Sequence, residues 1–130
     1  FDLDADGIAA PLYPAHATDW YLLVDVDVGR ETEGMTSLEG MANLRKKGRF
    51  PLDISEGIAV ALFMGEEVSN RAMLLPGSVY RKNDVPYVSL RKDPLLGTTH
   101  YRIFASRPNR HYPNWGVASC RERMWVTDTP

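Results

Sequence analysis

Residues 20–28 read Trp-Tyr-Leu-Leu-Val-Asp-Val-Asp-Val and carry the strongest strand signal in the chain. The first five residues are apolar or aromatic, and the last four alternate between aspartate and valine. A period of two places Asp25 and Asp27 on one face of a strand. The stretch therefore predicts a strand that is covered on both faces in its first half and solvated on one face in its second half.

Two helices are predicted after this strand. Thr36 and Glu39 have the spacing of a capping box, and Asp53 and Glu56 repeat it. Residues 58–64 are apolar on nearly every side, which is typical of a buried central helix. We therefore expect the second helix, over residues 54–64, to be the centre of the core.

The remainder of the chain favours strands. They are predicted at residues 72–75, 79–82, 85–90, 101–106 and 117–120, with the second and third joined as a hairpin around Asn83 and Asp84. This order predicts an α+β fold, with a mainly antiparallel sheet of about five strands and two helices packed on one face. Residues 1–19 are expected to form an irregular acidic arm, and residues 20–130 a single domain.

The composition limits the class of protein. The chain has 130 residues, of which 44% are hydrophobic and 25% charged, as in an ordinary globular domain. No apolar run approaches the roughly 18 residues of a membrane span, so no membrane partner is expected. The single cysteine, Cys120, excludes an internal disulfide framework. Its apolar neighbours are typical of a core residue, although with a histidine it could form a nucleophile–base pair.

Charge is unevenly distributed along the chain. The net charge is −2, yet residues 1–33 carry eight acids and one base, whereas residues 34–130 carry nine acids and 14 bases. One interpretation is that the two parts neutralise each other within one fold. The other is an anion-binding surface on the basic C-terminal third.

Five residues of that basic third are candidate binding residues. Arginines interleaved with aromatic rings suit a phosphate-bearing ligand or a single-stranded nucleic acid. The alternative is that the arginines pair with the acidic arm and the aromatic rings belong to the core. The candidates are Arg102, Arg107, Arg110, His111 and Trp115.

Paired carboxylates suggest a second kind of chemistry. On a regular strand Asp25 and Asp27 would lie roughly 6.5–7 Å apart, close enough to share a divalent ion or to divide acid and base roles. With His100 they are the candidate catalytic residues of a metal-assisted hydrolase. The alternative is the solvated half of a strand, or an ion pair with a C-terminal arginine.

The N-terminal residues copy part of a calcium loop. Asp2, Asp4 and Asp6 precede Gly7 in the calcium-loop pattern, but Tyr13 stands where a bidentate glutamate belongs. The same residues resemble the paired aspartates of phosphoryl-transferring hydrolases, although no apolar strand leads into them. We therefore predict no metal site, and no cofactor is expected.

Five segments of the chain can be compared with known families: residues 21–29, 48–52, 56–59, 85–89 and 115–120. Together they resemble an uncharacterised, largely actinobacterial domain family of unknown function. The resemblance implies a small, cytoplasmic, bacterial domain, and it implies no activity. The expected function is a non-enzymatic binding or interaction module of unknown ligand, with the metal-assisted hydrolase as the alternative; enzymatic activity and oligomeric state stay open.

Overall fold

The structure is a computed structural model that describes residues 20–126. It contains helices and a predominantly antiparallel set of strands, which confirms the predicted α+β class. Among the helices at residues 20–126, none has the length and apolar composition that a membrane crossing requires. The elements in chain order are β1 (Trp20–Val24), α1 (Ser37–Lys46), β2 (Phe50–Pro51), α2 (Ile54–Phe63), α3 (Gly65–Val68), β3 (Ala72–Leu74), the 3₁₀ turn η1 (Arg81–Asn83), β4 (Val85–Lys92), β5 (Thr99–Ser106), β6 (Trp115–Val117), β7 (Ser119–Cys120) and β8 (Glu122–Val126).

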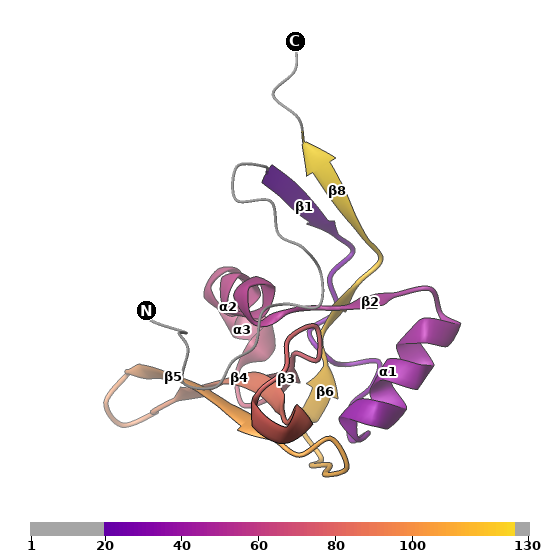
Figure 1. The fold of residues 1–130 in the computed structure, drawn as a ribbon. Coiled ribbons are helices and arrows are strands. Elements are labelled where there is room, and N and C mark those ends of the chain that lie inside the picture. Colours follow the sequence, from indigo (N-terminus) through magenta and orange to yellow (C-terminus); the bar gives the residue numbers. More distant parts are fainter. Residues whose placement is uncertain (1–19, 127–130) are drawn as a thin grey trace.

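The strands form one four-stranded sheet and two small ribbons (Figure 1). The sheet has the order β5-β4-β3-β6, antiparallel except for the parallel pair of β3 and β6. The ribbons are the antiparallel pairs β1–β8 and β2–β7. Sequence-distant segments therefore meet at each ribbon, and β5 forms one edge of the sheet.

Both predicted capping boxes are present. The side chain of Thr36 accepts a hydrogen bond of 3.1 Å from the backbone N–H of Glu39, whose carboxylate accepts one from the N–H of Thr36. Asp53 and Glu56 exchange the equivalent pair at the start of α2, at 2.8 and 2.9 Å. Each cap satisfies N–H groups that have no partner within the helix, so the capping residues mark where each helix begins.

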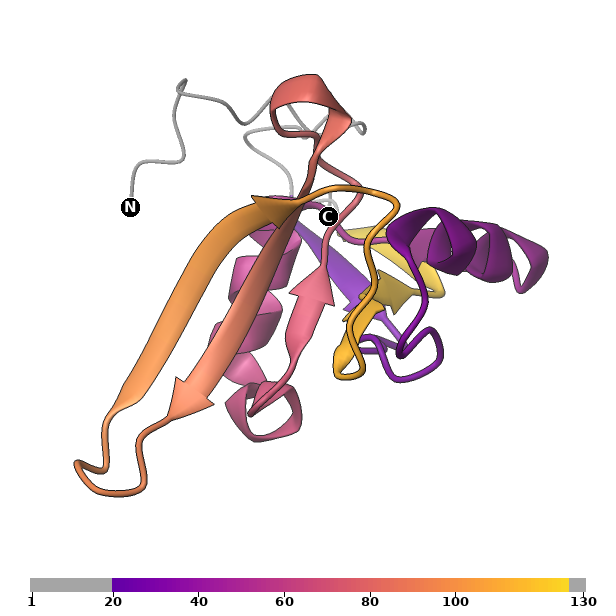
Figure 2. The same cartoon turned by 90° about the horizontal axis from the view of Figure 1, so that it is seen from below.

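Helix α2 packs against one face of the four-stranded sheet, and α1 lies beside β6 at the end of the sheet (Figure 2). Met73 and Val88 belong to the core cluster that contains α2 residues. Ala72 and Leu74 are their neighbours along β3 and pack in a second cluster with Leu44 of α1. Because successive side chains of a strand point to opposite faces, these two clusters lie on the two sides of the sheet.

The predicted hairpin over residues 79–90 is wrong. Residues 81–83 form η1, in which Lys82 and Asn83 have positive φ values of 56° and 68°. The hairpin of this region instead joins β4 to β5, which pair over all eight residues of each strand. Asparagine tolerates a left-handed conformation, so Asn83 does mark a turn, but the turn leads into β4 and does not connect two paired strands.

The prediction that α2 is buried all round is also wrong. Ile54 and Val60 are buried, whereas Leu62 is 67% exposed and Phe63 is 91% exposed. The helix presents one side to the sheet and leaves apolar side chains at its C-terminal end in solvent. Exposed apolar side chains of this size are informative when several lie together.

Candidate anion-binding site

One surface of the four-stranded sheet is polar and basic. Ser89 and Arg91 alternate along β4 with Val88 and Leu90, which are buried in the cluster that contains α2 residues. Ser89 lies opposite Arg102 of β5 in the antiparallel register. Because residues in register share a face, Arg91 and Arg102 point to the side of the sheet away from α2.

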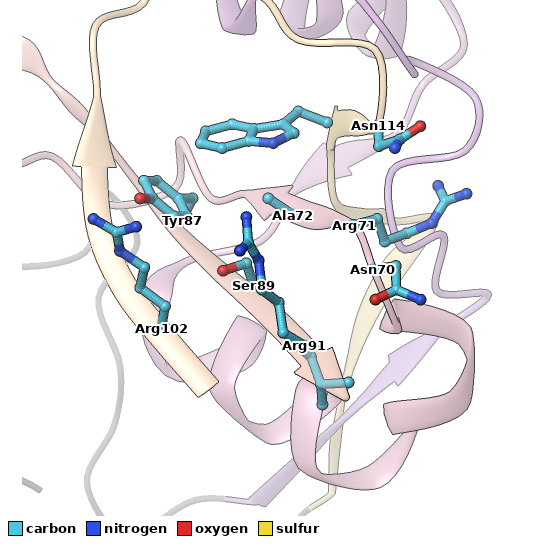
Figure 3. Close-up of a pocket in the computed structure, with 10 residues that line it drawn as sticks. Asn70, Arg71, Ala72, Tyr87, Ser89, Arg91, Arg102 and Asn114 are labelled. Atoms are coloured by element: carbon cyan, nitrogen blue, oxygen red, sulfur yellow. The ribbon is translucent and has the colours of Figure 1, made fainter. Parts of the chain in front are cut away.

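A cavity of about 340 Å³ lies on this surface (Figure 3). Its volume falls within the range of small-molecule sites. Strands β3, β4, β5 and β6 each contribute to its walls, together with the residues just before β3 and β6. The lining residues are Asn70, Arg71, Ala72, Tyr87, Ser89, Leu90, Arg91, Arg102, Asn114 and Trp115.

The three arginines of the cavity differ in their surroundings. Arg71 forms an ion pair with Glu33, with 3.6 Å between Nη2 and the carboxylate oxygen, and its side chain is 15% exposed. Its Nη1 is buried and has no hydrogen-bond partner in the structure. Within residues 20–126, no carboxylate forms an ion pair with Arg91 or Arg102. Figure 3 shows the guanidinium of Arg91 reaching into the middle of the cavity. Two cations therefore lie in the cavity without an ion-paired carboxylate from residues 20–126.

Aromatic rings form one wall of the cavity. The ring of Trp115 packs against those of Tyr87 and Tyr112, with 4.5 Å between ring centroids in each pair. Tyr87 is only 6% exposed, so this wall is anchored in the core. The carbonyl of Asn114 accepts a hydrogen bond of 3.3 Å from the N–H of Ala72, which fastens the start of β6 to β3.

The polar side chains that line the cavity are mainly hydrogen-bond donors. Guanidinium groups, two amides and a hydroxyl can donate hydrogen bonds to anionic oxygens. Among the described lining residues there is no carboxylate, histidine or thiol. The lining therefore suits the binding of an anion better than general acid–base catalysis.

The structure brings together two of the five binding residues predicted from sequence. Arg102 and Trp115 line the cavity from the two edge strands of the sheet, β5 and β6. Arg107, Arg110 and His111 are exposed on the connection between β5 and β6 and do not line it. The role of all five residues in binding stays a prediction.

Other lining residues were missed by the sequence interpretation. Arg71 and Asn70 come from the segment before β3, and Asn114 immediately precedes β6. The outward position of Ser89 and Arg91 could have been predicted from the sequence, because they alternate with apolar residues along β4. That alternation identifies an outward face but not which strands border it.

The structure separates Asp25 from a regular strand. Strand β1 ends at Val24, and Asp25 has a positive φ of 56°, so the predicted strand over residues 20–28 is wrong beyond Val24. Nη1 of Arg49 donates to Oδ2 of Asp25 at 3.0 Å, and its Nε donates to Oγ of Ser119 at 2.9 Å. The arginine that pairs with Asp25 therefore precedes α2 and is not one of the C-terminal arginines.

Asp27 and His100 have separate local roles. The carboxylate of Asp27 accepts N–H groups of the three residues at 29–31, at 3.2–3.3 Å, and so closes a turn. The ring Nε2 of His100 lies 3.2 Å from the hydroxyl of Thr98 on the β4–β5 hairpin. Within residues 20–126 no group of three or more His, Cys, Asp or Glu side chains could hold a metal ion. The catalytic roles proposed for Asp25, Asp27 and His100 stay predictions.

Two further candidates can be placed briefly. Asp2, Asp4 and Asp6 lie outside the described residues, as does the rest of the predicted arm over residues 1–19. Cys120 is fully buried in the core, and burial raises the pKa of its thiol. A raised pKa disfavours the thiolate, which is the reactive form.

A scan against protein-family models matches residues 7–87 to a family of unknown function, DUF5701. The match covers more than half of the 130-residue chain. The protein belongs to the DUF5701 family. This confirms the predicted resemblance to an uncharacterised family. No curated protein and no solved structure matches the chain significantly.

The DUF5701 match covers only some of the residues that line the cavity. Asn70, Arg71 and Tyr87 lie within the matched residues. Arg91 and Arg102, the cavity arginines for which no ion pair is found within residues 20–126, follow the match, as do Asn114 and Trp115. The match alone therefore does not extend to the charges that distinguish the cavity.

A buried ion pair joins the DUF5701-matched part to the end of the described chain. Arg123 of β8 donates from Nε and Nη2 to the carboxylate of Glu56, at 2.7 Å each. Burial is the largest effect and raises the pKa of Glu56, but the hydrogen bonds from Arg123, the Asp53 N–H and the Tyr21 hydroxyl, together with the charge of Arg123, hold that pKa below its ordinary value. The Tyr21 hydroxyl donates to the same carboxylate at 2.9 Å, and the pKa of Tyr21 is raised by burial and by this hydrogen bond. Every polar group of this cluster has a role in holding β1 and β8 to α2.

Proposed function

We propose that this DUF5701 protein is a non-enzymatic binding module that holds a small anionic ligand in the cavity lined by Arg71, Arg91 and Arg102. The observation that supports the proposal most directly is the presence of Arg91 and Arg102 in one cavity without a carboxylate partner among residues 20–126. Arg71 adds a third guanidinium, whose ion pair with Glu33 has a nitrogen–oxygen distance of 3.6 Å.

Electrostatics favours an anion at this position. Arg91 and Arg102 are on neighbouring strands of one face, where like charges repel, and no carboxylate of residues 20–126 forms an ion pair with either. An anion between them removes that repulsion. A guanidinium presents a planar fork of donors that matches phosphate or carboxylate oxygens, and paired hydrogen bonds to such anions are stronger than neutral ones. The exposed Arg107, Arg110 and His111 would add long-range attraction that salt screens.

The metal-assisted hydrolase suggested by Asp25, Asp27 and His100 stays a prediction. The contacts of Asp25 are with Arg49, and those of Asp27 are with the turn at residues 29–31. No observation in the described part of the chain favours that hypothesis over ligand binding.

The proposal can be tested with inorganic phosphate and phenyl phosphate. Binding is measured by calorimetry and by ¹H–¹⁵N spectra of the arginine side chains, at low and at physiological salt. The double variant Arg91→Gln/Arg102→Gln should weaken binding at least about tenfold, since a hydrogen bond to a charged group is worth roughly 1.5–3 kcal/mol.

The matched control is Arg45→Gln/Lys46→Gln, which removes the same charge from exposed positions on α1. Its affinity should change less than about twofold. If both double variants weaken binding equally, net charge alone attracts the anion and the cavity is not the site. If the unmodified protein binds neither compound, the proposal is wrong.

A further inference from the structure

Strand β5 is a long sheet edge that nothing in residues 20–126 pairs with on its outer side. It has eight residues, Thr-His-Tyr-Arg-Ile-Phe-Ala-Ser, which include four residue types favoured in strands and no proline. Natural proteins usually protect such edges with proline, lysine, bulges or short strands. An edge of this length that no strand of residues 20–126 covers offers a row of backbone N–H and C=O groups to another extended segment.

An apolar groove runs beside this edge. Its volume is about 300 Å³, and it lies between α2 and β5. Leu62 is 67% exposed and Tyr101 is 46% exposed, so apolar area of the groove faces solvent. The groove is on the α2 side of the sheet, opposite the arginine cavity. Its lining residues are Ile58, Ala61, Leu62, Val88, Tyr101 and Ile103.

The two faces of β5 differ in chemistry. Tyr101 and Ile103 face the groove, whereas His100 and Arg102 alternate with them and point to the other side. A strand added beside β5 would place its own side chains alternately over these two faces. Apolar side chains would fit over Tyr101 and Ile103. Acidic side chains would fit beside Arg102, which has no ion pair among the described residues.

The geometry points to β5 as a docking edge for an extended peptide segment of a partner protein, in which acidic and apolar residues alternate. The peptide adds a fifth strand to the sheet by backbone hydrogen bonds, and the groove and Arg102 select its side chains. This mode of recognition combines main-chain hydrogen bonds for affinity with alternate side-chain sites for specificity. It does not require the ligand of the arginine cavity, although Arg102 takes part in both.

A synthetic peptide provides the direct test. The probe is fluorescein-labelled Ser-Asp-Val-Asp-Ile-Asp-Ser with blocked ends, titrated with the full chain and followed by fluorescence anisotropy. Two matched peptides replace either every Asp by Lys or the central Asp by Pro. The acidic peptide should bind at least about tenfold more tightly than either, because the first replacement juxtaposes like charges and the second removes a ladder hydrogen bond.

Protein variants separate the contributions. Leu62→Glu should weaken the acidic peptide at least about tenfold while leaving inorganic phosphate binding unchanged, because Leu62 lies only in the groove. Arg102→Glu should reverse the preference in favour of the Lys peptide. Leu38→Glu, at a 59% exposed position on α1, is the control and should bind the acidic peptide normally.

Three results would overturn the proposal. The first is equal binding of all three peptides, and the second is normal binding by Leu62→Glu. The third concerns residues 2–8 of the chain, Asp-Leu-Asp-Ala-Asp-Gly-Ile, whose first five residues have the same alternation. In a variant of the full chain, Asp2, Asp4 and Asp6 are all changed to Asn. If the peptide binds this variant but not the unmodified chain, the N-terminal segment of the chain itself occupies the β5 edge and no partner segment is required.

Discussion

Arg123 and Glu56 form a two-pronged ion pair, with both hydrogen bonds at 2.7 Å, between β8 and the first turn of α2. The Glu56 side chain is 3% exposed and that of Arg123 is 12% exposed. The same carboxylate accepts hydrogen bonds from the Tyr21 hydroxyl and from the N–H of Asp53, both at 2.9 Å. One buried carboxylate therefore joins the β1–β8 ribbon to the helix that packs on the sheet.

Removing one partner of this pair should destabilise the protein strongly. We expect Arg123→Met to lower the free energy of unfolding by about 3–5 kcal/mol, because the charge of Glu56 would be left buried without its partner. The double variant Arg123→Met/Glu56→Leu should lose less stability than the sum of the losses in the two single variants. Urea denaturation of all four proteins measures this coupling, and additive losses would show that the pair acts as two independent residues.

The same pair predicts an acid-side loss of stability. A carboxyl group with a lower pKa in the folded state adds stability above its ordinary pKa, which is 4.5 for Glu56, and this stability is lost as the pH falls through the folded pKa. Asp53 acts with the opposite sign, since burial raises its pKa and stability falls as the pH rises from its ordinary towards its raised value. Glu56→Gln should therefore flatten the loss of stability on acidification. Denaturation at a series of pH values checks this, and an unchanged acid slope would contradict it.

Gly116 should not tolerate a side chain. A Cβ atom at this position would overlap the backbone carbonyl of Gly29, which has a φ of 105°. The carbonyl belongs to the backbone and the position of the Cβ is fixed by the backbone, so neither can rotate away and Gly116→Ala should cost roughly 1–3 kcal/mol or more. Gly65→Ala is the matched control, because its nearest neighbour would be a side-chain atom of Leu90 at an ordinary 3.8 Å. Equal thermal stability of the two variants would contradict the close approach.

Two leucines should respond differently to truncation. Leu90 is 2% exposed and sits in the core cluster, so Leu90→Ala should cost about 2–5 kcal/mol. Leu62 is 67% exposed, and Leu62→Ala should cost less than about 1 kcal/mol. Chemical denaturation distinguishes them. A large loss for Leu62→Ala would restore the prediction that α2 is surrounded by the core.

Local sequence was a sound guide wherever the determining contacts are local. The capping boxes at Thr36 and Asp53 involve groups three residues apart, and both were predicted correctly. The end of β1 was not predicted correctly. Asp25 adopts a left-handed conformation there and pairs with Arg49, which lies 24 residues further along the chain. Contacts of that range leave no mark in the periodicity of residues 20–28.

The α+β class, the helix starts and the basic character of the C-terminal third could be predicted from the amino-acid sequence, because each depends on short-range pattern or on composition. That Arg71, Arg91 and Arg102 share a cavity became clear only from the folded arrangement of the strands. The tertiary structure also places α2 beside β5 with Leu62 exposed. The physical reason is that strand order and helix placement depend on which distant surfaces pack most favourably together, and alternation along one strand reveals an outward face without naming its neighbours.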